Sequence, residues 1–297
     1  MLDFKNMKEK INNCDFKIVN LQVDESLISK KQLKNFLVNL DPNILDQKYL
    51  KSRNTRNAIY QINCPFYLKT LVLKRSLPNP NYKKHRLLSF YLRNIFKNYG
   101  KLGFYGAKML IKNKIPTQTP LAYWKYQKSY FIYESCLLYE KIITPYSVRD
   151  LLKQNPKNGT ADQIRKRQIL LESMAKLTRD LHSKNLLHGD LICNNFLVKS
   201  PEQLDDPKRE TIDLIVIDTD HMSYNIFPTK FFKRFFSLKC IRRVNPQLEG
   251  VEEYLKIYLK DEFSYFWLRV LIFWGWWDKR PFKKIRHKLL RLLSLKV

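Results

Sequence analysis

The sequence predicts an α+β protein made of two parts, a small strand-rich part followed by a larger helical part. Two observations carry this prediction. Short runs rich in β-branched, aromatic and leucine residues dominate up to about residue 134, and amphipathic helical periodicity dominates after it. The length of 297 residues and the hydrophobic fraction of 44% are sufficient for a packed core.

Four short segments of the first part have the composition and alternation of strands in an antiparallel sheet. These predicted strands are 16–23, 58–63, 67–75 and 129–134, and the second and third form a hairpin. Ser26 is expected to cap a helix that runs to about Leu40, and helical periodicity also covers 87–96 and 105–111.

The second part contains a long amphipathic helix over 163–183, whose apolar residues share one face. A loop at 187–198, a polar insert at 200–211 and an apolar strand at 212–217 follow it. We expect a hinge near residues 134–140. The predicted domains are an N-terminal extension of unassigned role at 1–45, a first lobe at 46–134 and a second lobe at 135–297.

Charge is the strongest compositional signal. The chain has 55 Lys and Arg against 27 Asp and Glu, a net charge of +28, and no acidic residue lies between Arg75 and Tyr133 or in 279–297. Such blocks predict a partner of opposite sign: nucleic acid, an anionic membrane face or a phosphorylated glycolipid. A solvated lysine-rich surface accounts for part of the excess. No nucleic-acid-binding module is recognisable, so nucleic acid is not expected.

The five cysteines argue against two classes of protein. Their number is odd and no pair has C-x-x-C spacing, so neither a disulfide framework nor a zinc site is predicted. The N-terminus has no apolar core, so no signal peptide is expected, and the apolar stretch 263–277 is too short to span a bilayer. These features indicate reduced thiols in the cytoplasm.

The chemistry-bearing motif is His188-Gly189-Asp190 with Asn195 five residues after the aspartate, followed by Asp218 at the end of an apolar strand. Phosphoryl transfer needs a carboxylate that orients the attacking hydroxyl and accepts its proton. It also needs oxygen ligands that hold Mg²⁺ against the ATP phosphates. A loop that carries Asp and Asn, followed by a strand that ends in Asp, meets both needs.

The chain resembles the protein-kinase-like superfamily and, within it, the bacterial lipopolysaccharide core kinases, which phosphorylate heptose or Kdo sugars. The resemblance is carried by HGDLICNNFLV, VIDTD, LVLKRSLPN and AKMLIKNKIPTQTPLAYW, and it covers roughly residues 50–225. It implies a two-lobed kinase-like fold with a small antiparallel-sheet N-lobe and a mainly helical C-lobe.

By this resemblance Asp190 is the catalytic aspartate, Asn195 and Asp218 are the metal ligands, and Lys74 contacts the ATP phosphates. His188 joins the catalytic set as a structural member of the loop. Lys69 competes with Lys74, since a separation of five puts the two on opposite faces of a strand. Lys74 is preferred because LVLK matches the family's pattern.

The sequence departs from protein kinases in several places. No helix glutamate is available to pair with the lysine, and Glu134, placed at the hinge, is predicted as a cofactor contact instead. The segment 51–57, with Arg53 and Asn54 as predicted phosphate contacts, stands where a glycine-rich loop is expected. Gly189 replaces the arginine that would hold a phosphorylated activation loop, which favours a sugar or small-molecule acceptor. Asp220 is expected to contact the metal site or to cap the next turn.

Aromatic and basic residues alternate in 229–245 and 266–297, a composition suited to the headgroup zone of an anionic bilayer. The alternative for 250–277 is a core helix with a basic outer face. We therefore expect an ATP- and Mg²⁺-dependent kinase of inner-core lipopolysaccharide sugars at the cytoplasmic face of the inner membrane. The alternatives are a related kinase of a drug or protein, and a non-catalytic kinase-like module that binds membranes or partners.

Overall fold

The computed structural model describes residues 17–39, 57–76, 97–129, 132–144, 146–241, 244 and 251–277. They divide into two compact units. The first comprises the described residues up to Ile143 together with Thr219–His221, and the second comprises the remainder. The break at Ile143 lies beyond the hinge predicted at 134–140, because strand β5 (Ile132–Glu140) continues through that stretch.

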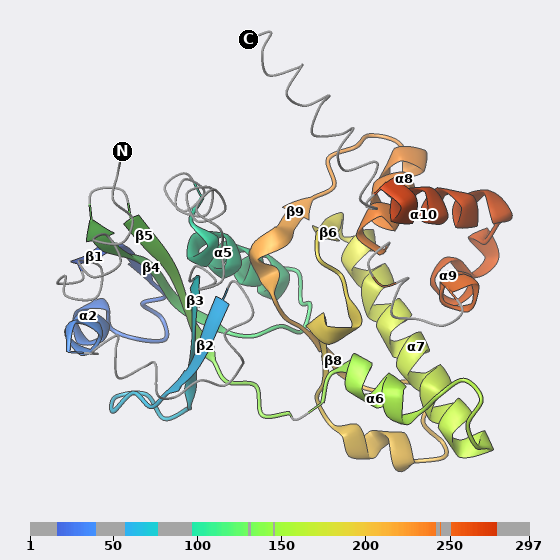
Figure 1. Ribbon diagram of the computed structural model, residues 1–297, viewed down its shortest axis with the longest axis horizontal. Coiled ribbons are helices and arrows are strands. Elements are labelled where there is room, and N and C mark those ends of the chain that lie inside the picture. Colours follow the sequence, from blue (N-terminus) through green and yellow to red (C-terminus); the bar gives the residue numbers. More distant parts are fainter. Residues whose placement is uncertain are drawn as a thin grey trace, which may run out of the picture. The chain divides into compact units, whose positions relative to one another are not determined.

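The first unit is built on a five-stranded antiparallel sheet of order β1-β4-β5-β3-β2 (Figure 1). The remaining strands are β1 (Lys17–Val23), β2 (Asn57–Ile62), β3 (Leu71–Ser76) and β4 (Pro120–Ser129). The predicted hairpin is confirmed, with Asn57 opposite Ser76 and Ile62 opposite Leu71. Strand β3 begins later than predicted, since Tyr67–Thr70 belong to the connection.

Residues 17–39 are part of this unit, which corrects the prediction of a separate N-terminal extension. Strand β1 pairs with β4 at one edge of the sheet. Helix α2 (Lys30–Val38) buries Leu33 and Leu37 against the sheet. The N-cap of α2 is Ser29, and the predicted cap, Ser26, instead donates a hydrogen bond to Asp24.

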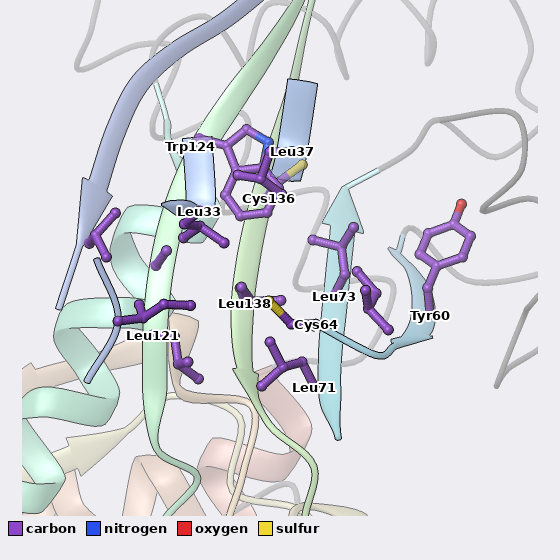
Figure 2. Packing of buried hydrophobic residues seen from close by; sticks show 14 of the residues in the cluster. Leu33, Leu37, Tyr60, Cys64, Leu71, Leu73, Leu121, Trp124, Cys136 and Leu138 are labelled. Carbon is purple, nitrogen blue, oxygen red and sulfur yellow. The ribbon is translucent and has the colours of Figure 1, made fainter. Parts of the chain in front are cut away.

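The two faces of the sheet bury different residues because strand side chains alternate between faces. One face packs under α2, where Leu73, Trp124 and Cys136 lie with the leucines of that helix (Figure 2). The opposite face buries Leu137 against Phe104 of helix α5 (Tyr99–Lys112). Lys74 lies directly beside Leu137 in the β3–β5 pair and therefore shares the α5 face.

Helix α5 begins very close to the sheet, and it contains the helix predicted over 105–111. The side chain of Asn98 caps it by accepting a hydrogen bond from the Lys101 amide at 3.0 Å. The amide of Gly100 donates to Ser135 Oγ at 2.7 Å. A Cβ atom at Gly100 would overlap the backbone carbonyl of Cys136, so this position requires glycine.

The second unit is mainly helical, with α7 (Ala161–Ser183) as its longest helix (Figure 1). This confirms the helix predicted over 163–183. A capping box between Thr160 and Gln163 defines its start. Its other helices are α6 (Val148–Gln154), α8 (Lys230–Ile241), α9 (Val251–Leu259) and α10 (Tyr265–Trp277). Within the described ranges, no helix combines the length and apolar character needed to cross a bilayer.

We expect Gly100→Ala to lower the free energy of unfolding by about 1–3 kcal/mol, the scale of overpacking. The direction of this change is informative, because the same substitution at an uncrowded helix position raises the free energy of unfolding by about 1 kcal/mol. Lys101→Ala, an exposed position in the same turn, is the matched control. Urea unfolding of both variants measures the difference, and equal or raised stability of Gly100→Ala would contradict the close approach.

Candidate active site

The predicted catalytic loop joins two short strand pairs of the second unit. Strand β6 (Leu186–His188) pairs with β9 (Met222–Tyr224), and β7 (Phe196–Val198) pairs with β8 (Leu214–Val216). The loop from Gly189 to Asn195 therefore connects β6 to β7. Because β7 and β8 are hydrogen bonded, the loop's C-terminal end is held beside the chain that leads to Asp218.

His188 holds this loop from inside. Its side chain is completely buried, and Nε2 donates to the carbonyl oxygen of Ile217 at 3.1 Å. The other ring nitrogen, Nδ1, accepts from the Asp190 amide at 3.3 Å. One ring nitrogen thus binds Ile217 and the other binds Asp190, so His188 ties the loop to the chain that follows β8. These contacts suit the structural role that was predicted for His188 within the catalytic set.

Asn195 makes the second set of connections. Its Nδ2 donates to the carbonyl oxygen of Asp190 at 2.8 Å, and its own carbonyl oxygen accepts from the Ile217 amide at 2.9 Å. The half-buried Asp190 therefore has its backbone held on both sides, by His188 and by Asn195. Cys193 is a buried spacer, since burial raises the pKa of its thiol to about 12 and keeps it protonated.

Asp218 follows Ile217 in an unusual backbone conformation. Its φ of 62° lies in the left-handed region, which is uncommon for residues other than glycine and is best tolerated by Asp and Asn. Such conformations persist where the surrounding structure determines them, and they cluster at functional sites. The predicted metal ligand thus stands at a sharp turn of the chain directly after β8.

The donor set of Asn195 and Asp218 suits Mg²⁺. The amide nitrogen of Asn195 is bound to Asp190, which leaves its side-chain oxygen as the atom suited to a cation. Across the described residues, no three His, Cys, Asp or Glu side chains gather as a metal cage. Two oxygen ligands fit a magnesium ion that takes its other ligands from nucleotide phosphates and water.

Lys74 of the first unit forms an ion pair with Asp220, with Nζ 3.4 Å from Oδ2. Both side chains are largely buried, at 14% and 10% exposure. The competing Lys69 lies outside β3 and pairs with Glu140 at 2.9 Å, with 66% of its side chain exposed. The structure thus places Lys74 in the sheet next to α5 and Lys69 on the surface. Sequence reasoning missed the partner of Lys74, because the two are 146 residues apart.

Glu134 has a different role from the predicted one. Its carboxylate binds the guanidinium of Arg75 at 2.6 Å, and both side chains are at most 3% exposed. The guanidinium also lies over the rings of Tyr60 and Tyr126. Glu134 therefore cannot reach a nucleotide, and the prediction of a cofactor contact is wrong. The other predicted phosphate contacts, Arg53 and Asn54, lie outside the described residues.

The chain was compared with known protein families, curated proteins and solved structures. The sequence profile of the Lipopolysaccharide kinase (Kdo/WaaP) family matches residues 104–237. Compared by sequence with curated proteins, the chain matches none. Among solved structures, WaaP in complex with acyl carrier protein is similar at 14% identity and a TM-score of 0.51, over 85% of this chain and 96% of that chain.

The Rio2 kinase of Chaetomium thermophilum, solved as an ADP/Mg²⁺-phosphoaspartate complex, aligns at 13% identity and a TM-score of 0.47, over 90% of this chain and 82% of that chain. The likeness to WaaP shows the fold. The chain has the α+β, protein-kinase-like fold predicted from its sequence.

We expect Glu134→Gln to lower the free energy of unfolding by about 3–5 kcal/mol, because it leaves the Arg75 cation buried without its counter-charge. The double variant Arg75→Met/Glu134→Leu should recover most of this loss, since it removes both charges. Thermal unfolding measures both effects. A variant Glu134→Gln that keeps its stability but loses nucleotide affinity would restore the cofactor contact rejected above.

Proposed function

We propose that the chain phosphorylates a heptose or Kdo sugar of the lipopolysaccharide inner core, because residues 104–237 match the profile of the lipopolysaccharide kinase (Kdo/WaaP) family. The match to this family and the likeness of the fold to WaaP support a phosphotransferase that uses ATP. The observation that supports the proposed chemistry is the hydrogen-bonded loop that carries Asp190 and Asn195 and is joined to the residue before Asp218.

In the proposed reaction, Asp190 accepts the proton of a sugar hydroxyl as that oxygen attacks the γ-phosphorus of ATP. The bond between the γ-phosphorus and the β–γ bridging oxygen breaks, and ADP leaves. A bound Mg²⁺, held by Asn195 and Asp218, would neutralise charge on the phosphates. Lys74 contributes a second positive charge toward them. Positioning and charge account for most catalysis of this kind.

Two features favour a catalytic protein over a non-catalytic module, and a sugar acceptor over a protein acceptor. A kinase-like protein without the helix glutamate could be non-catalytic, because the lysine would lack a carboxylate partner. In this chain Lys74 has such a partner in Asp220. Gly189 stands where a protein kinase carries the arginine that binds a phosphorylated activation loop. A sugar acceptor needs no such loop.

The second unit presents an aromatic surface that fits a membrane-bound acceptor. We define it by Phe231 and Phe232 of α8 and by Tyr265, Phe266, Ile272 and Phe273 of α10. These side chains are 40–64% exposed, although each is apolar or aromatic. The four from α10 recur at the spacing of one helical face, and the exposed Arg269 lies among them.

Aromatic contacts between α8 and α10 hold the two helices of this surface together. Trp274 of α10 packs on Phe235 of α8 and donates a hydrogen bond to its carbonyl oxygen at 3.1 Å. Phe231 reaches across to Trp267, with ring centroids 5.4 Å apart. The outer rings are thus presented by a rigid helix pair.

We infer that the aromatic surface lies against an anionic bilayer, with the exposed cations Lys230 and Arg269 near lipid phosphates. The net charge of +28 supports the same partner. The proposed location is the cytoplasmic face of the inner membrane, where this kinase would meet its glycolipid. The basic segment 279–297, predicted to share this role, lies outside the described residues.

We expect Asp190→Ala to lower the rate of phosphoryl transfer by roughly 10²–10⁴-fold, because the hydroxyl proton loses its acceptor. Affinity for the nucleotide and the unfolding temperature should change little. The assay incubates protein, ATP and Mg²⁺ with truncated core glycolipids and measures the added phosphate by mass. The control is Asp213→Ala, an exposed aspartate of the same unit. Equal transfer by Asp190→Ala would remove the assignment.

The double variant Phe266→Ser/Phe273→Ser should bind anionic vesicles at least tenfold more weakly, since burying one aromatic side chain contributes about 1.5–3 kcal/mol. Co-sedimentation with phosphatidylcholine vesicles that contain phosphatidylglycerol measures the binding. Added salt should weaken binding of the unaltered chain. Ile164→Ser, at an exposed apolar position on α7, is the control. Undiminished binding by the double variant would refute a role for the aromatic surface.

A further inference from the structure

We propose that Asp220 is the positioning residue of Lys74 and takes the place of the helix carboxylate that pairs with this lysine in protein kinases. The inference rests on the proposed function, which assigns Lys74 to the ATP phosphates. It deepens that proposal by identifying what holds the lysine. The carboxylate comes from the turn after Asp218, not from the helix.

The first step of the argument is the pair itself. Lys74 Nζ lies 3.4 Å from Asp220 Oδ2, and the other carboxylate oxygen, Oδ1, is buried with His221 Nε2 3.7 Å away. Burial of a charged side chain is costly unless an opposite charge lies beside it, and these two side chains are only 14% and 10% exposed. Each charge therefore constrains the position of the other.

The second step is that α5 offers no carboxylate of its own. The helix shares a face of the sheet with Lys74, which is where protein kinases place the glutamate. Its sequence, YGKLGFYGAKMLIK, contains no acidic residue, and none occurs between Arg75 and Tyr133. A carboxylate for Lys74 has to come from another segment.

The third step explains how that segment comes so close to α5. Thr219 Oγ1 donates to the carbonyl oxygen of Gly103 at 2.7 Å, and this bond is buried. A Cβ at Gly103 would lie 3.9 Å from Cβ of Asp220 and only 2.7 Å from Cδ2 of Leu137, the neighbour of Lys74 in β5. The glycine thus leaves room for Leu137 beneath α5, and a Cβ there would be in ordinary contact with Asp220. Asp220 therefore lies next to this part of α5 and supplies the charge that the helix lacks.

The test uses binding of a non-hydrolysable ATP analogue with Mg²⁺, which requires no acceptor. We expect Asp220→Asn to raise the dissociation constant on the order of tenfold, the scale of one charge-assisted contact. The same substitution in a Lys74→Met background should cause no further loss, because Asp220 acts through the lysine. Asp180→Asn, which breaks a surface Lys–Asp pair with Lys184, is the matched control and should leave binding unchanged.

Additive losses in the two backgrounds, or unchanged binding by Asp220→Asn, would overturn the proposal. If Asp220→Asn does not fold, the comparison is made between Asp220→Glu and Asp220→Gln, whose side chains have equal length and differ in charge. The charged variant should retain most of the affinity and the neutral one should lose it, and equal affinities would count against the pair.

The proposed function fails separately. Normal nucleotide binding without phosphorylation of any core glycolipid would refute the acceptor and leave the role of Asp220 intact. Failure of the unaltered chain to bind the nucleotide would refute both.

Discussion

The hydrogen bond from His188 to the carbonyl oxygen of Ile217 is the contact on which the proposed chemistry depends. It joins the loop that carries Asp190 to the residue before Asp218, and the amide of Ile217 returns a second bond to Asn195. Because His188 is fully buried, water does not compete for its ring nitrogens. The backbone of Asp190 is held by His188 and Asn195, which fixes the loop that carries the proposed catalytic carboxylate.

Cations of the first unit take their carboxylates from distant parts of the chain. The described pairs are Lys69 with Glu140, Lys74 with Asp220, Arg75 with Glu134 and Lys108 with Asp24. The partners are 59 to 146 residues apart in sequence. The cause is the absence of acidic residues between Arg75 and Tyr133, which leaves α5 and most of the central sheet without local counter-charges. Long-range pairing thus compensates for a strongly biased composition.

The sequence predicted features that depend on nearby residues, and it did not predict contacts between residues that are far apart in the chain. Helix α7 and the β2–β3 hairpin were predictable because periodicity and capping residues act within a few positions. The loop of Asp190 was predictable for the same reason, since its residues are close in sequence. Glu134 was misassigned because the sequence near the predicted hinge gives no sign of its ion pair with Arg75. The two residues lie on strands β5 and β3, which become neighbours only in the folded sheet. The sequence also did not predict that residues 17–39 belong to the first unit, because the pairing of β1 with β4 joins segments that are far apart in sequence.

The carboxylate that pairs with Lys74 comes from a different part of the fold than the one that pairs with this lysine in protein kinases. In protein kinases the glutamate belongs to a helix whose position can change independently of the metal-binding aspartate, and activation uses that freedom. In this chain Asp220 belongs to the segment Thr219–His221 of the first unit, which directly follows Asp218 in sequence. The hydrogen bond between Thr219 and Gly103 anchors this segment to α5. Displacement of this segment from α5 would therefore remove the counter-charge of Lys74, so the environment of the lysine depends on this turn.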